Sequence, residues 1–250
     1  MHNPETPLYV VGDIHGHLDA LIDALDLIAV DGGQDAKVVF VGDLVDRGPD
    51  SRGVIEYLIN GIANGRDWTV LKGNHDRMFE WFMESPPRHD PHLLVDMHWF
   101  HPKIGGIETM ASYGVEVIPM TSRLYQVHAL AQDAVPQAHV SFLRSLKLSH
   151  IVGNFVLVHA GLDPAVPLDR QAENDLLWLR PTSVIYPDDM GFTLVHGHTP
   201  ESIPKYYGNR INVDGGAAFG NPIVPVALIG SDAFLLTANG RVKMEISAAD

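Results

Sequence analysis

The 250-residue sequence contains no cysteine. Without thiols the chain can form no disulfide framework and no thiolate metal site. It also has no thiol that could act as a covalent nucleophile. Any metal site must therefore use oxygen and nitrogen ligands, and any catalysis must use another nucleophile.

Positive charge is scarce. The chain has 17 Lys and Arg against 31 Asp and Glu, which gives a formal net charge of −14, and no run of basic residues occurs. A surface this acidic repels the phosphate backbone of duplex DNA and RNA. We therefore expect no nucleic acid duplex as a partner.

Long hydrophobic runs are also missing. The longest apolar stretch, residues 223–230, is far shorter than the roughly 20 residues that span a bilayer. The first residues, Met1–Thr6, lack the basic and apolar regions of a secretory signal. These features predict a cytoplasmic protein without a membrane partner.

The composition that remains is that of a globular protein, with 46% hydrophobic residues. Domains hold roughly 100 to 200 residues, and α/β domains often reach about 250. We predict one domain over residues 1–250, with two small domains as the alternative.

Short β-branched and aromatic runs recur between Gly, Asn and Asp residues, which is typical of buried strands. Apolar residues with helical spacing follow the first and second runs, at residues 18–28 and 54–62. The chain is therefore predicted to begin β-α-β-α-β. The six predicted strands are Leu8–Val11, Val38–Val41, Trp68–Leu71, Phe155–Val158, Phe192–Val195 and Ile211–Val213.

The C-terminal third differs, because residues 223–229, 233–237 and 242–246 follow one another across Gly-containing turns, as hairpin strands do. The pattern fits two sheets or one large mixed sheet in an α/β fold. Residues 80–150 are rich in His, Pro and Met. We interpret them as a mostly helical insertion over one end of the sheet, above the active site.

Polar fragments follow the predicted strands, where open α/β sheets build their sites. They are Gly12-Asp13-Ile14-His15-Gly16, Gly42-Asp43-Leu44-Val45-Asp46-Arg47-Gly48, Gly73-Asn74-His75-Asp76, Val158-His159-Ala160-Gly161 and Gly197-His198-Thr199-Pro200.

Within these fragments, Asp13 and His15 lie two residues apart, so both side chains of an extended segment point to one side and can hold one ion. Asp43 has two carboxylate oxygens and can bridge two ions.

Asn74, His159 and His198 supply an amide oxygen and two imidazoles for a second ion. This mixed oxygen and nitrogen set suits Mn, Fe, Zn, Co or Ni better than Ca or Mg. Each residue alone would be read as a buried, hydrogen-bonded polar side chain. All five fragments together favour a centre of two divalent ions. Among these metals we expect Mn first.

The ordered fragments from residue 12 to 200 resemble the calcineurin-like metallophosphoesterases, and within them the bacterial and phage members of the serine/threonine phosphoprotein phosphatase branch. The resemblance implies a four-layer α/β/β/α sandwich of two mixed sheets with a dinuclear centre at the sheet ends. It implies one ion held by Asp13, His15 and Asp43 and a second held by Asp43, Asn74, His159 and His198.

Two divalent ions about 3.5 to 4 Å apart acidify a bridging water for in-line attack on phosphorus and stabilise the leaving oxygen. His75 is the candidate general acid, and Asp46 is placed to hold its other ring nitrogen. Arg47 can grip phosphate oxygens. Arg180 resembles a second phosphate-binding arginine of the family, although a surface role is equally compatible with its position.

The leading function is therefore a metal-dependent phosphomonoesterase whose partner is a phosphorylated protein or a small phosphoester. Asp76 departs from the Glu that is more common in this branch and matches symmetrical diadenosine tetraphosphate hydrolases. Those hydrolases usually lack the acid that Asp46 supplies. A nucleotide pyrophosphohydrolase is thus the alternative, and an idle phosphate-binding scaffold is a weaker third.

Two groups of residues in the insertion have open roles. A pyrophosphohydrolase needs groups that hold nucleosides, and Trp81, Phe82, Trp99, Phe100 and Tyr113 could serve, although their spacing favours a core role. The histidines there could form a zinc site, but an ordinary surface role is favoured. They are His89, His92, His98 and His101.

Three further residues lie close to the motif fragments. His17 and His196 flank predicted ligands, and the sequence does not decide whether they face the substrate. Asp214 either orients a ligand histidine or sits in a strand-end turn.

Overall fold

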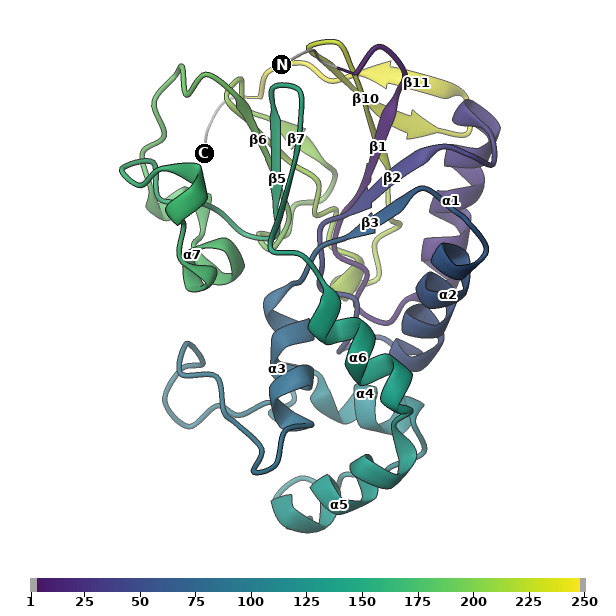
Figure 1. Ribbon diagram of the computed structural model, residues 1–250, viewed down its shortest axis with the longest axis vertical. Coiled ribbons are helices and arrows are strands. Elements are labelled where there is room, and N and C mark those ends of the chain that lie inside the picture. The colour runs from purple at the N-terminus through teal and green to yellow at the C-terminus, as the bar shows by residue number, and fades with distance from the viewer. Residues whose placement is uncertain (1–3, 248–250) are drawn as a thin grey trace.

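The computed structural model describes residues 4–247, so residues 1–3 and 248–250 of the predicted domain lie outside it. The first sheet has the strand order β11-β10-β9-β1-β2-β3. Strands β1 (Leu8–Val11), β2 (Lys37–Phe40) and β3 (Trp68–Val70) are parallel. Strands β9 (Val226–Ile229), β10 (Asp232–Thr237) and β11 (Gly240–Lys243) add antiparallel hairpins (Figure 1).

The second sheet has the order β4-β5-β6-β8-β7. Its central strands β5 (Phe155–Val158), β6 (Thr193–His196) and β8 (Arg210–Asn212) are parallel. The edge strands β4 (Ser149–Val152) and β7 (Lys205–Tyr206) pair antiparallel to their neighbours. Both sheets are therefore mixed. In each sheet the carboxyl ends of the three parallel strands lie at the same edge.

Side-chain alternation along the strands builds the layers. Leu8 and Val10 of β1 pack between the two sheets with Phe155 and Leu157 of β5. The intervening side chains of β1, including Tyr9, face helices α1 (Leu18–Gly32) and α2 (Ser51–Ala63). On the far side, the second sheet packs against α7 (Glu173–Trp178) and the chain around it. The predicted four-layer α/β/β/α sandwich is confirmed (Figure 1).

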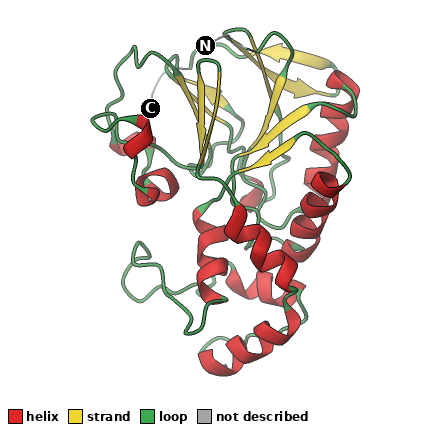
Figure 2. Ribbon diagram, viewed as in Figure 1, coloured by secondary structure: helices red, strands yellow, loops and turns green. Residues whose placement is uncertain are grey.

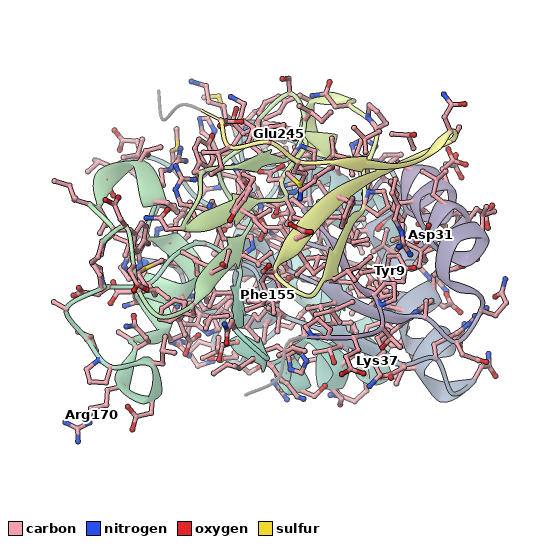
Figure 3. All side chains as sticks on the ribbon, turned by 90° about the horizontal axis from the view of Figure 1, so that it is seen from above. Tyr9, Asp31, Lys37, Phe155, Arg170 and Glu245 are labelled. Carbon is pink, nitrogen blue, oxygen red and sulfur yellow. The ribbon has the colours of Figure 1, made fainter. Side chains whose placement is uncertain are left out.

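Helix α1 is tied to the first sheet at its C-terminal end. The Tyr9 hydroxyl donates to Asp31 Oδ2 at 2.6 Å, and the Arg241 guanidinium of β11 donates to the same carboxylate at 2.8 Å. Figure 3 shows Tyr9 and Asp31 side by side at this edge of the molecule. One carboxylate therefore joins β1, α1 and β11.

Between β3 and β4 the chain leaves the sandwich and forms a separate group of helices beneath the strand ends (Figure 2). This group contains α3 (Asn74–Phe82), α4 (Gly106–Ser112), α5 (Leu124–Ala134) and α6 (Gln137–Ser145). Residues 83–105 contain neither helix nor strand. The predicted insertion is therefore helical in its second half and irregular in its first.

The strand predictions were correct in place and wrong by a few residues at some ends. Strand β9 begins at Val226 rather than at residue 223, because Pro225 cannot donate a ladder hydrogen bond. Strand β11 ends at Lys243, and Ile246 forms an isolated bridge with Tyr206 instead. The short strands β4 and β7 were not predicted. Within residues 4–247, no helix has the length and apolar character that crossing a membrane requires.

Candidate active site

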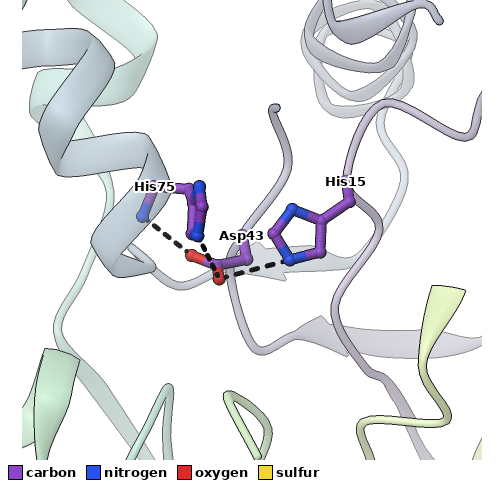
Figure 4. Close-up of side chains that lie close together, drawn as sticks. All are labelled: His15, Asp43 and His75. Carbon is purple, nitrogen blue, oxygen red and sulfur yellow. Dashed lines mark hydrogen bonds and ion pairs between the residues drawn. The ribbon is translucent and has the colours of Figure 1, made fainter. Parts of the chain in front are cut away.

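The strand ends of both sheets bring the predicted ligands together. Asp13 follows β1, Asp43 follows β2 and Asn74 follows β3, while His159 and His198 follow β5 and β6. All are at most 9% exposed. Asp43 lies between the two groups, with Oδ2 3.5 Å from His15 Nε2 and Oδ1 3.4 Å from His159 Nε2 (Figure 4 shows the His15 side).

The imidazoles of His15 and His159 are each oriented so that the lone pair on Nε2 points toward other hydrogen-bond acceptors. His15 Nδ1 donates to the Val45 carbonyl at 2.9 Å, and His159 Nδ1 donates to the Val41 carbonyl at 3.0 Å. In a neutral ring, Nε2 is then unprotonated. His159 Nε2 lies 3.0 Å from Asn74 Oδ1, which is also an acceptor. Opposed lone pairs at this distance fit a cation that binds both atoms.

A third imidazole and the carboxylates point to the same conclusion. His198 Nε2 is buried and has no hydrogen-bond partner among the described residues. Burial, together with the charges of Asp214 and Asp43, raises the pKa of Asp13 well above its ordinary value. Burial would raise the pKa of Asp43 too, but the charges of His159 and the other neighbouring imidazoles outweigh it and lower that pKa. Buried acids and orphaned imidazoles together form a donor set suited to divalent cations.

Two donor groups within the described chain have the spacing of metal sites. One joins His15, Asp43 and His75, and the other joins Asp43, His159 and His198. The first group contains His75 rather than Asp13, whose Oδ2 is 4.0 Å from His15 Nε2. The two groups share Asp43, as a dinuclear centre requires.

The backbone at the site is strained. Among residues 4–247, seven non-glycine residues have a positive φ, and five of them belong to the predicted site: His15, Asp43, Asp46, Arg47 and His198. Such conformations are costly and persist where the surrounding structure enforces them. The backbone at Gly73 also lies very close to the Asp43 carboxylate. A Cβ at this position would lie 2.1 Å from Asp43 Oδ1, so only glycine fits there.

Asp76 holds the loop that carries Asp43. Its Oδ2 accepts from the backbone N–H of Asp43 at 2.9 Å and of Gly73 at 2.8 Å, and its Oδ1 accepts from Leu44 N–H at 2.9 Å. Burial and the charge of Asp43 raise the pKa of Asp76 to about 7. The residue that distinguishes this fragment from the common Glu form therefore positions the shared ligand.

His75 and Asp46 form the predicted pair. His75 Nδ1 lies 2.6 Å from Asp46 Oδ2, and Asp46 is fully buried. Burial would lower the pKa of His75, but the charges of Asp43 and Asp46 outweigh it and raise that pKa. His75 Nε2, the nitrogen that does not contact Asp46, is 4.0 Å from Asp43 Oδ2 and therefore faces the candidate metal centre (Figure 4).

Sequence reasoning missed two partners of Asp46. Trp99 Nε1 donates to Asp46 Oδ2 at 2.9 Å, and Thr109 Oγ1 donates to Asp46 Oδ1 at 2.6 Å. Both come from the insertion, 53 and 63 residues further along the chain. No local motif marks them. The insertion thus fixes the orientation of the carboxylate that holds His75.

The two predicted phosphate-binding arginines differ in setting. Arg47 Nη2 lies 3.4 Å from His75 Nε2, and its buried Nε has no hydrogen-bond partner within residues 4–247. Its Cζ lies 5.8 Å from the ring centre of the exposed Phe219. Arg180 is exposed. The pKa of His198 is lowered mainly by burial, then by the charge of His159, and also by the charge of Arg180. Both cations therefore act on the site.

The contacts of three further candidates are also defined. His196 Nδ1 contacts the Gly197 carbonyl and its Nε2 accepts from Arg210, so this ring is satisfied within the second sheet. His17 is the residue before α1 and makes no capping bond with its side chain. Asp214 lies against Asp13 and accepts from Gly216 N–H, and these contacts fit the second of its two expected roles, an aspartate in a strand-end turn.

Comparisons with known proteins agree with this geometry. The family model for calcineurin-like phosphoesterases matches residues 6–219. The asymmetrical bis(5′-nucleosyl)-tetraphosphatase PrpE of Bacillus velezensis is 27% identical over 237 residues, covering 86% of each chain. The symmetrical bis(5′-nucleosyl)-tetraphosphatase of Nitrosospira multiformis is 30% identical over 166 residues, covering 65% of this chain and 46% of that protein.

A solved structure shares the fold. A protein described provisionally as a diadenosine tetraphosphatase superposes with a TM-score of 0.62 and 20% identity, covering 99% of this chain and all of that one. Because the family model spans most of the sequence, the chain belongs to the calcineurin-like phosphoesterase family. It is a hydrolase of the dinuclear-metal phosphoesterase class, with buried His and Asp clusters that suit its two ions.

Proposed function

We propose that this enzyme hydrolyses dinucleoside polyphosphates such as diadenosine tetraphosphate. The observation that carries the proposal is the similarity to PrpE over 86% of both chains. The match to the symmetrical enzyme and the Asp76 form of the third fragment support it. The leading interpretation from the sequence alone, a phosphomonoesterase, thereby becomes the second candidate.

The proposed ligands are Asp13, His15 and Asp43 for one ion and Asp43, Asn74, His159 and His198 for the other. Mn is our first choice of metal. Two bound divalent cations would supply an acidified water nucleophile and neutralise charge on the phosphate oxygens. The buried protein donors would hold those cations in place, and their burial would keep bulk water away.

The chain's own groups supply the rest of the chemistry. His75, with Nδ1 held by Asp46, donates its Nε2 proton to the leaving phosphate oxygen. Arg47 lies beside that nitrogen and binds a phosphate oxygen through its guanidinium. Arg180, which is exposed, binds phosphates further from the cleaved bond. These roles fit the hydrolysis of either a pyrophosphate bond or a phosphate monoester, so the choice between the two rests on the similarity to PrpE.

A parallel assay tests the proposal. The Mn-loaded enzyme is given diadenosine tetraphosphate, a phosphothreonine peptide and p-nitrophenyl phosphate, and kcat/KM is measured for each. We expect the dinucleotide to be the best substrate. Two ADP molecules as products would indicate symmetrical cleavage, whereas ATP and AMP would indicate asymmetrical cleavage.

The second candidate is a serine/threonine phosphatase-like phosphomonoesterase. Asp46 favours it, because this acid is a feature of the phosphoprotein phosphatase branch that the sequence resembles, and it holds His75 at 2.6 Å. A phosphothreonine peptide with a higher kcat/KM than the dinucleotide in the same assay would select this candidate over our proposal.

A further inference from the structure

The insertion contains a cavity of about 670 Å³, separate from the buried donor groups. It lies between the irregular segment 83–105 and the chain that leads into α5. Its volume falls within the range of about 300 to 1,000 Å³ that is usual for small-molecule sites. The cavity therefore has the size of a ligand site.

The walls of this cavity are rich in planar rings. Its aromatic walls are Phe82, Trp99 and Phe100, which pack with ring centres about 5 Å apart and are at most 7% exposed. Three imidazoles complete this lining: His89, His98 and His101. Apolar ring surfaces beside ring nitrogens suit a ligand that has a flat apolar part and also forms hydrogen bonds.

The rim of the cavity is apolar and open to solvent. Ile118, Met120 and Leu124 line it and are 48%, 107% and 56% exposed. Apolar side chains gathered at the mouth of a concave site mark a binding site more often than chance exposure does. A ligand with an apolar planar part would cover them.

Two structural elements contact both the cavity and the candidate metal centre. Asn74, Met78 and Phe82 occupy one face of α3 at spacings of four residues. Asn74 lies at the metal centre, and Met78 and Phe82 line the cavity about 6 and 12 Å further along the helix. Trp99 forms a wall of the cavity while its Nε1 donates to Asp46, the partner of His75.

We propose that this cavity binds the purine nucleoside end of a nucleotide substrate whose phosphates lie at the metal centre. The proposal rests on the proposed function and specifies where one nucleoside of a dinucleoside polyphosphate is held. A small concave volume, ring-lined walls and a shared helix face favour a nucleoside over a macromolecular partner, which would need a broader surface.

A matched pair of variants on α5 tests the proposal. Leu124 lines the cavity mouth and is 56% exposed, whereas Leu130 is 55% exposed on the same helix and does not line the cavity. Leu124→Trp should narrow the mouth, and Leu130→Trp is the control. We expect Leu124→Trp to raise KM for diadenosine tetraphosphate about 10-fold, which corresponds to about 1.4 kcal/mol.

The same assay includes inorganic tripolyphosphate, which has no nucleoside. Its kcat and KM should be unchanged in both variants, and kcat for the dinucleotide should change little. Equal KM values for the dinucleotide in the two variants would overturn the inference and leave the proposed function intact. A KM that rises equally for tripolyphosphate would also overturn it, because the damage would then lie at the metal centre.

Direct binding separates the inference from the assigned reaction. Adenosine is added to the Mn-loaded protein in equilibrium dialysis, with ribose as the control ligand. We expect wild type and Leu130→Trp to bind adenosine and Leu124→Trp to bind it at least 10-fold more weakly. No binding of adenosine to wild type would overturn the inference, even if the enzyme hydrolyses the dinucleotide. Binding without hydrolysis would uphold the site and reject the proposed function.

Discussion

At the scale of single residues, Asp43 is the side chain on which both halves of the candidate metal centre depend. Its two carboxylate oxygens face His15 on one side and His159 on the other, within 3.5 Å. Asp13 Oδ2 lies 4.0 Å from His15 Nε2, while both Asp13 oxygens already accept from the backbone N–H of His198 at 3.2 Å. The two acids therefore differ in how many ions they can hold.

We predict that Asp43→Asn removes both ions, because the amide nitrogen cannot coordinate a cation on its side and the bridge is lost. Asp13→Asn, the matched control, should retain one ion. Elemental analysis of purified protein gives the metal content per chain. Two ions per chain in Asp43→Asn would contradict the bridging role.

A second prediction concerns proton transfer. His75→Asn should leave the metal content unchanged and lower kcat by about 10² to 10⁴, the usual contribution of a general acid. Thr109→Val removes both hydrogen bonds between Thr109 Oγ1 and Asp46 but leaves the bond from Trp99 Nε1 to the Asp46 carboxylate, so it should cost much less. Steady-state kinetics on diadenosine tetraphosphate and elemental analysis measure both effects. If kcat is the same in His75→Asn and wild type, His75 is not the acid.

Residues at strand ends were predictable because each ligand follows a recognisable strand within a short fragment. Trp99 and Thr109 were not, because they lie in the insertion, 53 and 63 residues along the chain from Asp46, and no local motif links them to it. Arg180 was predicted by resemblance alone, and its role stays a proposal. Sequence patterns thus locate side chains within short local motifs and miss side chains that reach the site from distant segments of the chain.

At the scale of elements, the irregular segment 83–105 is held to the rest of the structure by a buried charge pair. Asp90 Oδ2 accepts from Arg77 NH2 of α3 at 2.8 Å and from Trp178 Nε1 of α7 at 3.3 Å. Both partners of the pair are at most 2% exposed. Trp178 also contacts His198, with ring centres 5.9 Å apart. Asp90 therefore links the insertion, α3 and α7 beside the site.

We predict that Asp90→Ala lowers the free energy of unfolding by about 3 to 5 kcal/mol, because it leaves the Arg77 charge buried without its main partner. The double variant Arg77→Met with Asp90→Ala should recover a large part of that loss. Urea denaturation of wild type, Asp90→Ala, Arg77→Met and the double variant gives the coupling free energy of the pair. Strictly additive losses would show that the pair is not the link between these elements.

Helices α1 and α2 and the central strands of the sandwich were predictable because burial on one or two faces imposes a 3.6- or 2-residue period on their sequences. Helix α7, with six residues, was not predicted. Segment 83–105 has no such period, since it is held by Asp90 and by an aromatic cluster rather than by regular hydrogen bonds. Strands β4 and β7 were missed because β4 has exposed residues and β7 has only two. Short or exposed edge strands carry too little pattern to be recognised.

At the scale of the whole molecule, the assignment of residues 1–250 to one domain stays a prediction. Helix α3 carries Asn74 at the candidate metal centre and Phe82 in the core shared with α1 and α2. We therefore expect the insertion and the sandwich to unfold together. Circular dichroism and tryptophan fluorescence should give coincident urea transitions. Two separated transitions would assign the insertion to a domain of its own.

The free energy of unfolding should depend on pH, and one buried histidine of the insertion contributes to that dependence. His139 of α6 is 5% exposed, and its Nδ1 lies 2.8 Å from the Tyr113 hydroxyl. Burial lowers the pKa of His139 below 6.5, its ordinary value. Between the folded pKa and about 6.5, the unfolded chain binds a proton that the folded protein does not. Unfolding is therefore favoured as pH falls through this window, and below the folded pKa the contribution stays constant.

We predict that the loss of unfolding free energy between pH 7.5 and pH 5.5 is smaller in His139→Asn than in wild type, because the variant has no imidazole to protonate on unfolding. Tyr113→Phe removes the same hydrogen bond but keeps the buried imidazole, so its loss should remain close to that of wild type. Urea titrations at the two pH values measure each difference, and effects of pH on the candidate metal centre cancel in the comparison. An equal loss in His139→Asn and wild type would mean that His139 does not contribute to the acid sensitivity of the fold.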